Sequence, residues 1–185
     1  MRGDAAAYVD DQRMLTYREL NSRANAVARA LITSGFKRGS VAAVRMEPSA
    51  DLLITLLAVL KAGGAYMRTE SEDGSWPRGL SIVDARGAGN GRCEAVDLTH
   101  VLTEELRPSP NLPILTRGSD VACVLRDHDG TPALLVPHAT ITSLSQRHVP
   151  SSVQWAGESG ALDMWVALMT GATIALSEAA SAAAA

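Results

Sequence analysis

Two short stretches of sequence decide the fold: LTYREL at residues 15–20 and LKAGGAY at residues 60–66. The first predicts the start of a helix. Thr16 is a good N-cap, and Glu19 follows at the spacing that lets the two side chains cap each other's free backbone N–H groups. The second predicts the end of a helix, because a pair of glycines interrupts an apolar helical pattern before an apolar strand resumes.

The segment between these stretches alternates between strand and helix patterns. Residues 41–44 are a short apolar run, which is typical of a strand buried on both faces. Residues 49–62 are rich in leucine and alanine, and residues 65–67 resume as a strand. This strand, helix, strand order predicts an α/β fold with a layered, mainly parallel sheet and flanking helices.

The rest of the chain continues this pattern with weaker signals. Further elements are expected as a hairpin over residues 8–16, a strand at 81–83, a helix at 98–106, strands at 121–125 and 133–136, a helix at 140–147, and a helix from 161 that breaks at Gly171 into a strand. A proline-rich stretch suggests an internal boundary near residues 107–119 within a domain of residues 1–178. Residues 179–185 are a low-complexity alanine tail or linker.

Composition excludes several classes of function. The chain has 17 basic and 20 acidic residues and a formal net charge of −3, with no basic run, so neither nucleic acid nor a membrane surface is an expected partner. The longest apolar stretch is too short to span a bilayer, and the first ten residues do not form a signal peptide, so we expect a cytoplasmic location. Cys93 and Cys123 are expected to be reduced and structural, with no disulfide framework and no metal site.

The two opening stretches carry a resemblance to a known family. Residues 15–20, followed by residues 23–25 and Ala28, resemble the first core motif of nonribosomal peptide synthetase adenylation domains, and residues 60–66 resemble the second. The resemblance implies the front part of the large N-terminal subdomain of such a domain. It also implies an activity that uses ATP and magnesium to activate an amino acid as its adenylate and to load it on a carrier-protein thiol.

Neither motif supplies a catalyst. Tyr17, Glu19, Gly63 and Tyr66 are best explained by capping, helix termination and packing. We therefore predict no catalytic residue in this part of the chain. Lys37 and Lys61 are the only lysines, which leaves two candidates for any mechanism that needs one.

The family's third motif, which resembles T-S-G-S-T-G-x-P-K-G, holds the ATP phosphates. Its flanking strands are recognisable at residues 120–125 and 134–138, but the loop between them is changed. The positions of this degenerate phosphate loop are Arg126, Asp127, His128, Asp129, Gly130, Thr131, Pro132 and Ala133, with Ala133 in place of the lysine.

This change reverses the local charge. Asp127 and Asp129 place two negative charges where a triphosphate would sit. At ~4 Å a pair of like charges costs about 1 kcal/mol in water, and more when desolvated. We expect no bound cofactor, since ATP and magnesium would be required only if the family activity survived. The alternative is a metal site formed by Asp127, His128 and Asp129, although three consecutive residues rarely converge on one ion.

The fourth motif is also altered. Glu158 aligns with the aspartate that would hold the substrate amino group, and the alternative is that it is an ordinary surface acid. Trp155 and Trp165 are expected in core or edge packing rather than in a substrate pocket. Because the family's later segments are missing, we also expect both tryptophans to be exposed on the truncated side as interface anchors.

These features predict an inactive, truncated adenylation domain that serves as a structural or interaction element of a nonribosomal peptide synthetase assembly line. Its expected partners are adjacent synthetase domains or a carrier protein, with self-association as a further possibility. One alternative is one half of a split, amino-acid-activating enzyme, which would not explain Ala133 or the acidic loop. Another is an ordered fragment of a longer polypeptide.

Overall fold

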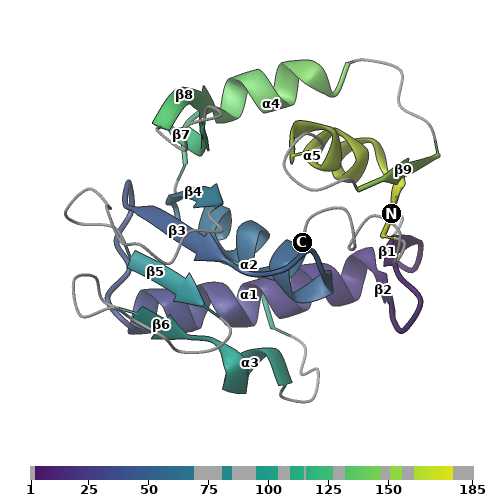
Figure 1. Ribbon diagram of the computed structural model, residues 1–185, viewed down its shortest axis with the longest axis horizontal. Helices are drawn as coiled ribbons and strands as arrows, with labels where there is room; N and C mark the ends of the chain where they lie inside the picture. Colours follow the sequence, from purple (N-terminus) through teal and green to yellow (C-terminus); the bar gives the residue numbers. More distant parts are fainter. Residues whose placement is uncertain are drawn as a thin grey trace.

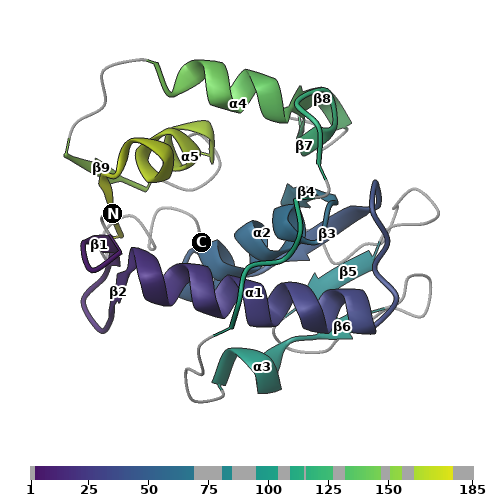
Figure 2. The same cartoon turned by 180° about the vertical axis from the view of Figure 1, so that it is seen from behind.

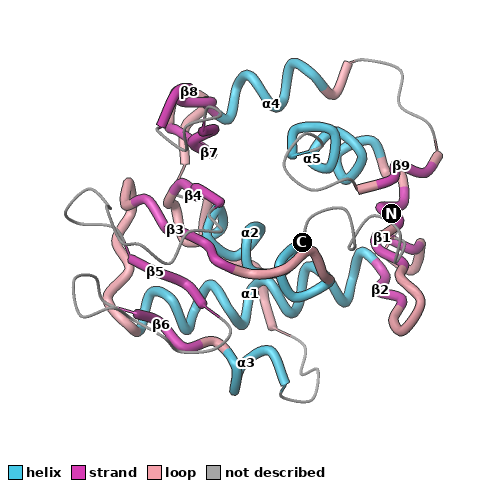
Figure 3. Tube along the Cα trace, in the orientation of Figure 1, coloured by secondary structure: helices cyan, strands magenta, loops and turns pink. Residues whose placement is uncertain are grey.

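The computed structural model describes residues 3–68, 81–84, 95–103, 109–114, 116–126, 132–146, 151–155 and 161–176. Figure 1 shows how their helices and strands are arranged, and Figure 3 marks the same elements by type. In chain order they are β1 (Ala6–Val9), β2 (Met14–Thr16), α1 (Tyr17–Thr33), β3 (Val41–Arg45), α2 (Ala50–Lys61), β4 (Ala65–Arg68), β5 (Ser81–Asp84), β6 (Ala95–Asp97), α3 (Thr99–Thr103), β7 (Val121–Arg126), β8 (Pro132–Pro137), α4 (His138–Leu144), β9 (Ser152–Gln154), α5 (Ala161–Thr170) and β10 (Thr173–Ala175).

The strands form two sheets. A six-stranded sheet has the order β6-β5-β3-β4-β7-β8 and is parallel except for the antiparallel pair β7 and β8. A four-stranded sheet has the order β2-β1-β10-β9, in which β10 runs parallel to both β1 and β9. The expected α/β fold with a mainly parallel sheet is therefore confirmed, and the second sheet is an addition to that expectation.

The first two long helices begin and end where local sequence directs them. The Thr16 hydroxyl accepts a hydrogen bond from the Glu19 backbone N–H at 3.2 Å, and the Glu19 carboxylate accepts one from the Thr16 backbone N–H at 2.8 Å, which completes the capping box before α1. Beyond α2, Gly63 adopts a φ of 84°, a conformation that favours glycine. The helices α1 and α2 pack side by side, and α1 crosses one face of the six-stranded sheet over β5 and β6 (Figures 1 and 2).

One main hydrophobic core joins both sheets to the helices. Its buried residues come from α1, α2 and α5 and from strands of each sheet. Side chains alternate between the two faces of a strand, so on β4 Tyr66 enters this core while Met67 packs with Val124 in a smaller cluster. Because the main core crosses between the sheets, the described parts of the chain are held together by packing as well as by strand pairing.

Several element boundaries differ from the sequence-based expectations. The helix expected at residues 98–106 is α3, which covers Thr99–Thr103. The helix expected at 140–147 is α4, which begins two residues earlier because Pro137 occupies its N-cap. The strands β6 and β9 were not expected, since three residues are too short for a clear alternation of side chains.

Three other expectations have different outcomes. Cys123 is free and buried, as expected, whereas Cys93 and the tail at residues 179–185 lie outside the described residues. The boundary near residues 107–119 stays a prediction. No helix in the described parts of the chain has the length and apolar character needed to cross a membrane.

Gly64 provides a test of this packing. A Cβ at this position would collide with the Phe36 ring and come within 2.8 Å of the Ser40 carbonyl oxygen. Gly64→Ala should therefore lower the free energy of unfolding by about 1–3 kcal/mol, as overpacking does. Denaturant unfolding measures this loss. The matched control is Gly118→Ala, whose Cβ would lie 3.5 Å from that of Ala139 and should change stability by less than about 0.5 kcal/mol. Equal effects of the two substitutions would contradict the packing described here.

Candidate functional site

The degenerate phosphate loop connects β7 to β8 at one edge of the six-stranded sheet. The two strands pair antiparallel, with Leu125 opposite Leu134 and Arg126 opposite Pro132, so the two expected strands around a turn are confirmed. The five loop positions Asp127, His128, Asp129, Gly130 and Thr131 lie outside the described residues, and only the backbone is described at Arg126, Pro132 and Ala133. The charge reversal in this loop therefore stays a prediction from sequence.

Glu158, the position aligned with the substrate-binding aspartate, also lies outside the described residues. The structure brings neither this residue nor the phosphate loop into a described site. Within the described ranges, no group of three or more His, Cys, Asp or Glu side chains could hold a metal ion.

Both candidate interface tryptophans are core residues. Trp155 is 2% exposed and Trp165 is 4% exposed, and both belong to the main hydrophobic core. The expectation that they are exposed as interface anchors is therefore wrong, while their assignment to packing is confirmed. The physical reason is that Trp165, on α5, faces β4 rather than solvent.

Trp165 and Tyr66 form a buried polar contact between α5 and β4. The indole Nε1 donates a hydrogen bond to the Tyr66 hydroxyl oxygen at 2.6 Å, and the ring centroids lie 6.0 Å apart with a 47° tilt. Burial raises the pKa of Tyr66 far above its ordinary value, with a smaller contribution from nearby Cys123. Burial likewise raises the pKa of the Cys123 thiol. Both groups therefore stay protonated near neutral pH, so neither supplies a base or a thiolate.

The tyrosine of the first motif has an equally structural role. Tyr17, the first residue of α1, donates its hydroxyl hydrogen to the Ala172 backbone oxygen at 2.6 Å. This bond joins the start of the chain to the turn between α5 and β10. The structural interpretation of Tyr17 is confirmed together with the capping role of Glu19.

Lys61, in the second motif, is held by a polar network along α1. Its Nζ donates to the Asn21 Oδ1 at 2.8 Å, and the half-buried ammonium has a pKa lowered by desolvation. The Asn21 amide donates to Asn111 at 2.9 Å, and the Asn25 amide donates to the Ser109 backbone oxygen at 2.8 Å. The network binds residues 109–111 to α1, so Lys61 acts in the described structure as an anchor.

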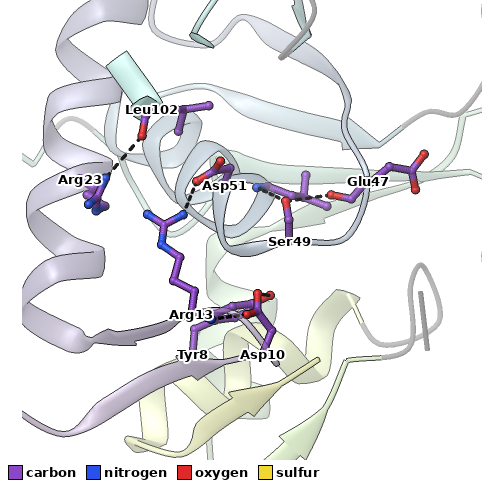
Figure 4. Close-up of polar contacts among 9 residues, drawn as sticks. Tyr8, Asp10, Arg13, Arg23, Glu47, Ser49, Asp51 and Leu102 are labelled. Atoms are coloured by element: carbon purple, nitrogen blue, oxygen red, sulfur yellow. Dashed lines mark hydrogen bonds and ion pairs between the residues drawn. The ribbon is translucent and has the colours of Figure 1, made fainter. Parts of the chain in front are cut away.

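A second polar group joins the β1–β2 hairpin to α2 (Figure 4). Arg13 Nη1 forms an ion pair with the Asp51 carboxylate at 2.8 Å, and the Tyr8 hydroxyl donates to Asp10 at 2.8 Å. Burial acts to raise the pKa of Asp10, but hydrogen bonds from Tyr8 and from the backbone N–H groups of Gln12 and Arg13 outweigh it and lower this pKa. Figure 4 also shows Arg23 on α1 reaching the Leu102 backbone oxygen. These contacts connect the β1–β2 hairpin to α2 and α1 to α3, so their role in the described structure is to hold the fold together.

Comparison with known proteins identifies the same family as the motifs. The family model described as AMP-binding enzyme matches residues 1–73. Bacitracin synthase 1 of Bacillus licheniformis is 28% identical over 204 residues, covering 95% of this chain and 4% of that protein. Tyrocidine synthase 1 of Brevibacillus parabrevis is 48% identical over 69 residues, covering 37% of this chain and 6% of that protein.

The fold is that of a solved adenylation subdomain. The N-terminal subdomain of Klebsiella oxytoca NpsA, in complex with 3-hydroxybenzoyl-AMSN, superposes with a TM-score of 0.75 at 24% identity and covers 94% of this chain. The chain spans 50% of that subdomain and a few per cent of the synthases it matches. Together the comparisons confirm the resemblance to adenylation domains that the two motifs indicate.

The Tyr66–Trp165 contact can be tested by a double-mutant cycle. Tyr66→Phe leaves the Trp165 Nε1–H buried without its acceptor, so the free energy of unfolding should fall by about 1–3 kcal/mol. Combined with Trp165→Phe, the cycle should give a coupling energy of about 0.5–3 kcal/mol. Tyr8→Phe is the control, because the partner Asp10 keeps two backbone hydrogen bonds when that hydroxyl is removed. Additive effects of the two core substitutions would show that the contact is not coupled.

The capping box makes a contribution that depends on pH. Hydrogen bonds from the Thr16 backbone and hydroxyl lower the pKa of Glu19 below its ordinary value of 4.5. A carboxyl whose pKa is depressed on folding stabilises the protein above the unfolded value and loses this contribution as pH falls through the folded value. Stability should therefore decline below about pH 4.5 less steeply in Glu19→Gln than in the wild type, as measured by thermal unfolding against pH. Identical slopes would contradict this role for Glu19.

Proposed function

We propose that this chain does not itself activate an amino acid and serves as a structural or interaction element of an assembly line. The chain has the motifs and the fold of a nonribosomal peptide synthetase adenylation domain. The observation that carries the proposal is the composition of the phosphate loop. Asp127 and Asp129 occupy positions where the family has small hydroxyl residues and glycine, and Ala133 occupies the position of the lysine. Two carboxylates repel a triphosphate, and Arg126 is the one permanently charged cation among the eight loop positions, where the family's lysine is absent.

Neither lysine of the chain offers a replacement. Lys61 is engaged with Asn21 on α1. Lys37 is exposed in the turn between α1 and β3 and belongs to neither motif. We therefore expect no ATP or magnesium to be required as a cofactor, and we assign no catalytic residue to this chain.

The proposed partners are the neighbouring domains of a synthetase. NpsA–ThdA from Klebsiella oxytoca, whose structure this chain also resembles, is an artificially fused adenylation–PCP di-domain. By analogy we propose that a carrier protein or another synthetase domain lies beside this chain. Because this chain would not load that carrier, a different adenylation domain acting in trans would have to do so.

The surface proposed for such contacts is the edge strand β8. Leu134 and Leu135 are 56% and 61% exposed, and they are consecutive residues on the outermost strand of the six-stranded sheet. Neighbouring residues on a strand point to opposite faces, so apolar side chains are exposed on both sides of this edge. An exposed apolar edge strand readily pairs with another chain. This surface replaces the tryptophans as the candidate interface.

Activity is tested by amino-acid-dependent ATP–pyrophosphate exchange across a panel of amino acids. The altered loop predicts no exchange above background, with an active adenylation domain as the positive control in the same assay. Exchange with any amino acid would overturn the proposal. If exchange appeared only after a second polypeptide carrying the later family motifs was added, the split-enzyme alternative would be favoured instead.

The interface is tested by charging the edge strand. The double variant L134K/L135K should weaken association with an adjacent synthetase domain, or self-association, by at least about tenfold, while changing stability little because both side chains are exposed. Sedimentation velocity measures the association. Ile114→Lys is the control, since Ile114 is 92% exposed and lies away from β8 in the sequence. Unchanged association in the double variant would exclude β8 as the interface.

A further inference from the structure

We propose that Arg68 anchors a binding site for a small oxyanion, a phosphate or a carboxylate, at the carboxyl edge of the six-stranded sheet. The proposal is independent of the proposed function, because it involves neither the phosphate loop nor the edge strand β8. It rests on the position of Arg68 in the sheet, on the burial of two of its guanidinium nitrogens, and on the groups that surround it.

Arg68 is the last residue of β4, where its strand leaves the sheet. It lies in register with Val44 of the parallel neighbour β3, and α2 connects these two strands. The carboxyl ends of parallel strands in an open α/β sheet form the edge at which such folds bind ligands. The strand order reverses at β3, because β4 and β5 lie on opposite sides of it, and such a reversal marks the crevice where open α/β sheets bind ligands.

Two of the three nitrogen atoms of the Arg68 guanidinium are buried without an acceptor. Its Nε and Nη1 atoms are inaccessible to solvent, and neither has a hydrogen-bond partner among the described residues. An arginine side chain remains protonated in proteins, so it cannot escape this situation by losing its charge. A buried, unpaired charge is costly, and each such group in a native structure requires an explanation such as a bound ion.

The nearest described polar groups do not neutralise Arg68. Tyr66 precedes it by two residues on the same face of β4, and the charge of Arg68 contributes to the electrostatic environment of the Tyr66 hydroxyl. That hydroxyl stays protonated because burial raises its pKa, as it does for the Cys123 thiol. This face therefore presents a positive charge next to neutral donors and acceptors.

Three other arginines of the chain have a carboxylate partner. Arg13 pairs with Asp51 at 2.8 Å, Arg18 pairs with Asp4 at 3.0 Å, and Arg38 pairs with Asp120 at 3.1 Å. Arg68 differs in having two nitrogen atoms that are buried without an acceptor. A small oxyanion matches these donors, because its oxygens can accept from more than one guanidinium N–H.

The first experiment measures thermal unfolding of the whole chain in Tris chloride, with and without inorganic phosphate, at matched ionic strength. Phosphate should raise the Tm of the wild type in a saturable manner, because a ligand that binds only the folded state stabilises it. The shift should disappear in Arg68→Met and persist in Arg18→Met, whose guanidinium forms an exposed ion pair. A parallel titration with acetate distinguishes a site that accepts carboxylates from one that requires phosphate.

The second measurement compares the variants without added oxyanion. Because Arg68→Met removes a buried charge that lacks a partner, this variant should unfold at the same temperature as the wild type or at a higher one. A large loss of stability, or a failure to fold, would mean that Arg68 already has a partner within the chain and would overturn the proposal. The proposal is equally wrong if neither anion stabilises the wild type, or if phosphate stabilises Arg68→Met to the same extent.

Discussion

The described fold depends on the closure of the chain on itself through β10. This strand lies between β1 and β9, with Tyr8 opposite Ile174, so the four-stranded sheet requires elements from both ends of the sequence. Two side-chain contacts reinforce the closure: the Tyr17 hydroxyl bonds to the Ala172 backbone, and the Trp165 indole bonds to Tyr66. Bringing β1 and β10 together closes a long loop of chain, which has an entropic cost. The buried and hydrogen-bonded residues at these contacts help to offset that cost.

The described residues of the two recognisable motifs serve this closure and the packing around it. The first motif caps α1 and bonds to the α5–β10 turn, while the second ends α2, places Tyr66 under Trp165 and attaches Lys61 to α1. Each of these residues contributes to holding secondary-structure elements together. A chain can therefore keep both motifs, and the fold they specify, whatever the chemistry of its phosphate loop. Fold and activity are separable properties of such a sequence.

Local features were predictable from the sequence, and long-range ones were not. The Thr16 capping box, the helix end at Gly63 and the break at Gly171 were predicted correctly, because each depends on a few neighbouring residues. The four-stranded sheet was missed because its strands are three or four residues long and pair across nearly the whole chain. The contact of Trp165 with Tyr66 was also missed, since the two residues lie 99 residues apart in sequence. For the candidate site, the sequence supplied the residues of the loop, but their arrangement lies outside the described part of the chain.

The central claim is that the altered loop does not hold a nucleotide. Isothermal titration calorimetry with ATP and magnesium, performed on the whole chain, tests it most directly. The two aspartates and the alanine in place of lysine predict no saturable heat at ligand concentrations up to about 100 μM, which corresponds to a binding free energy weaker than about −5.5 kcal/mol. Stoichiometric binding of ATP tighter than this limit would contradict the account.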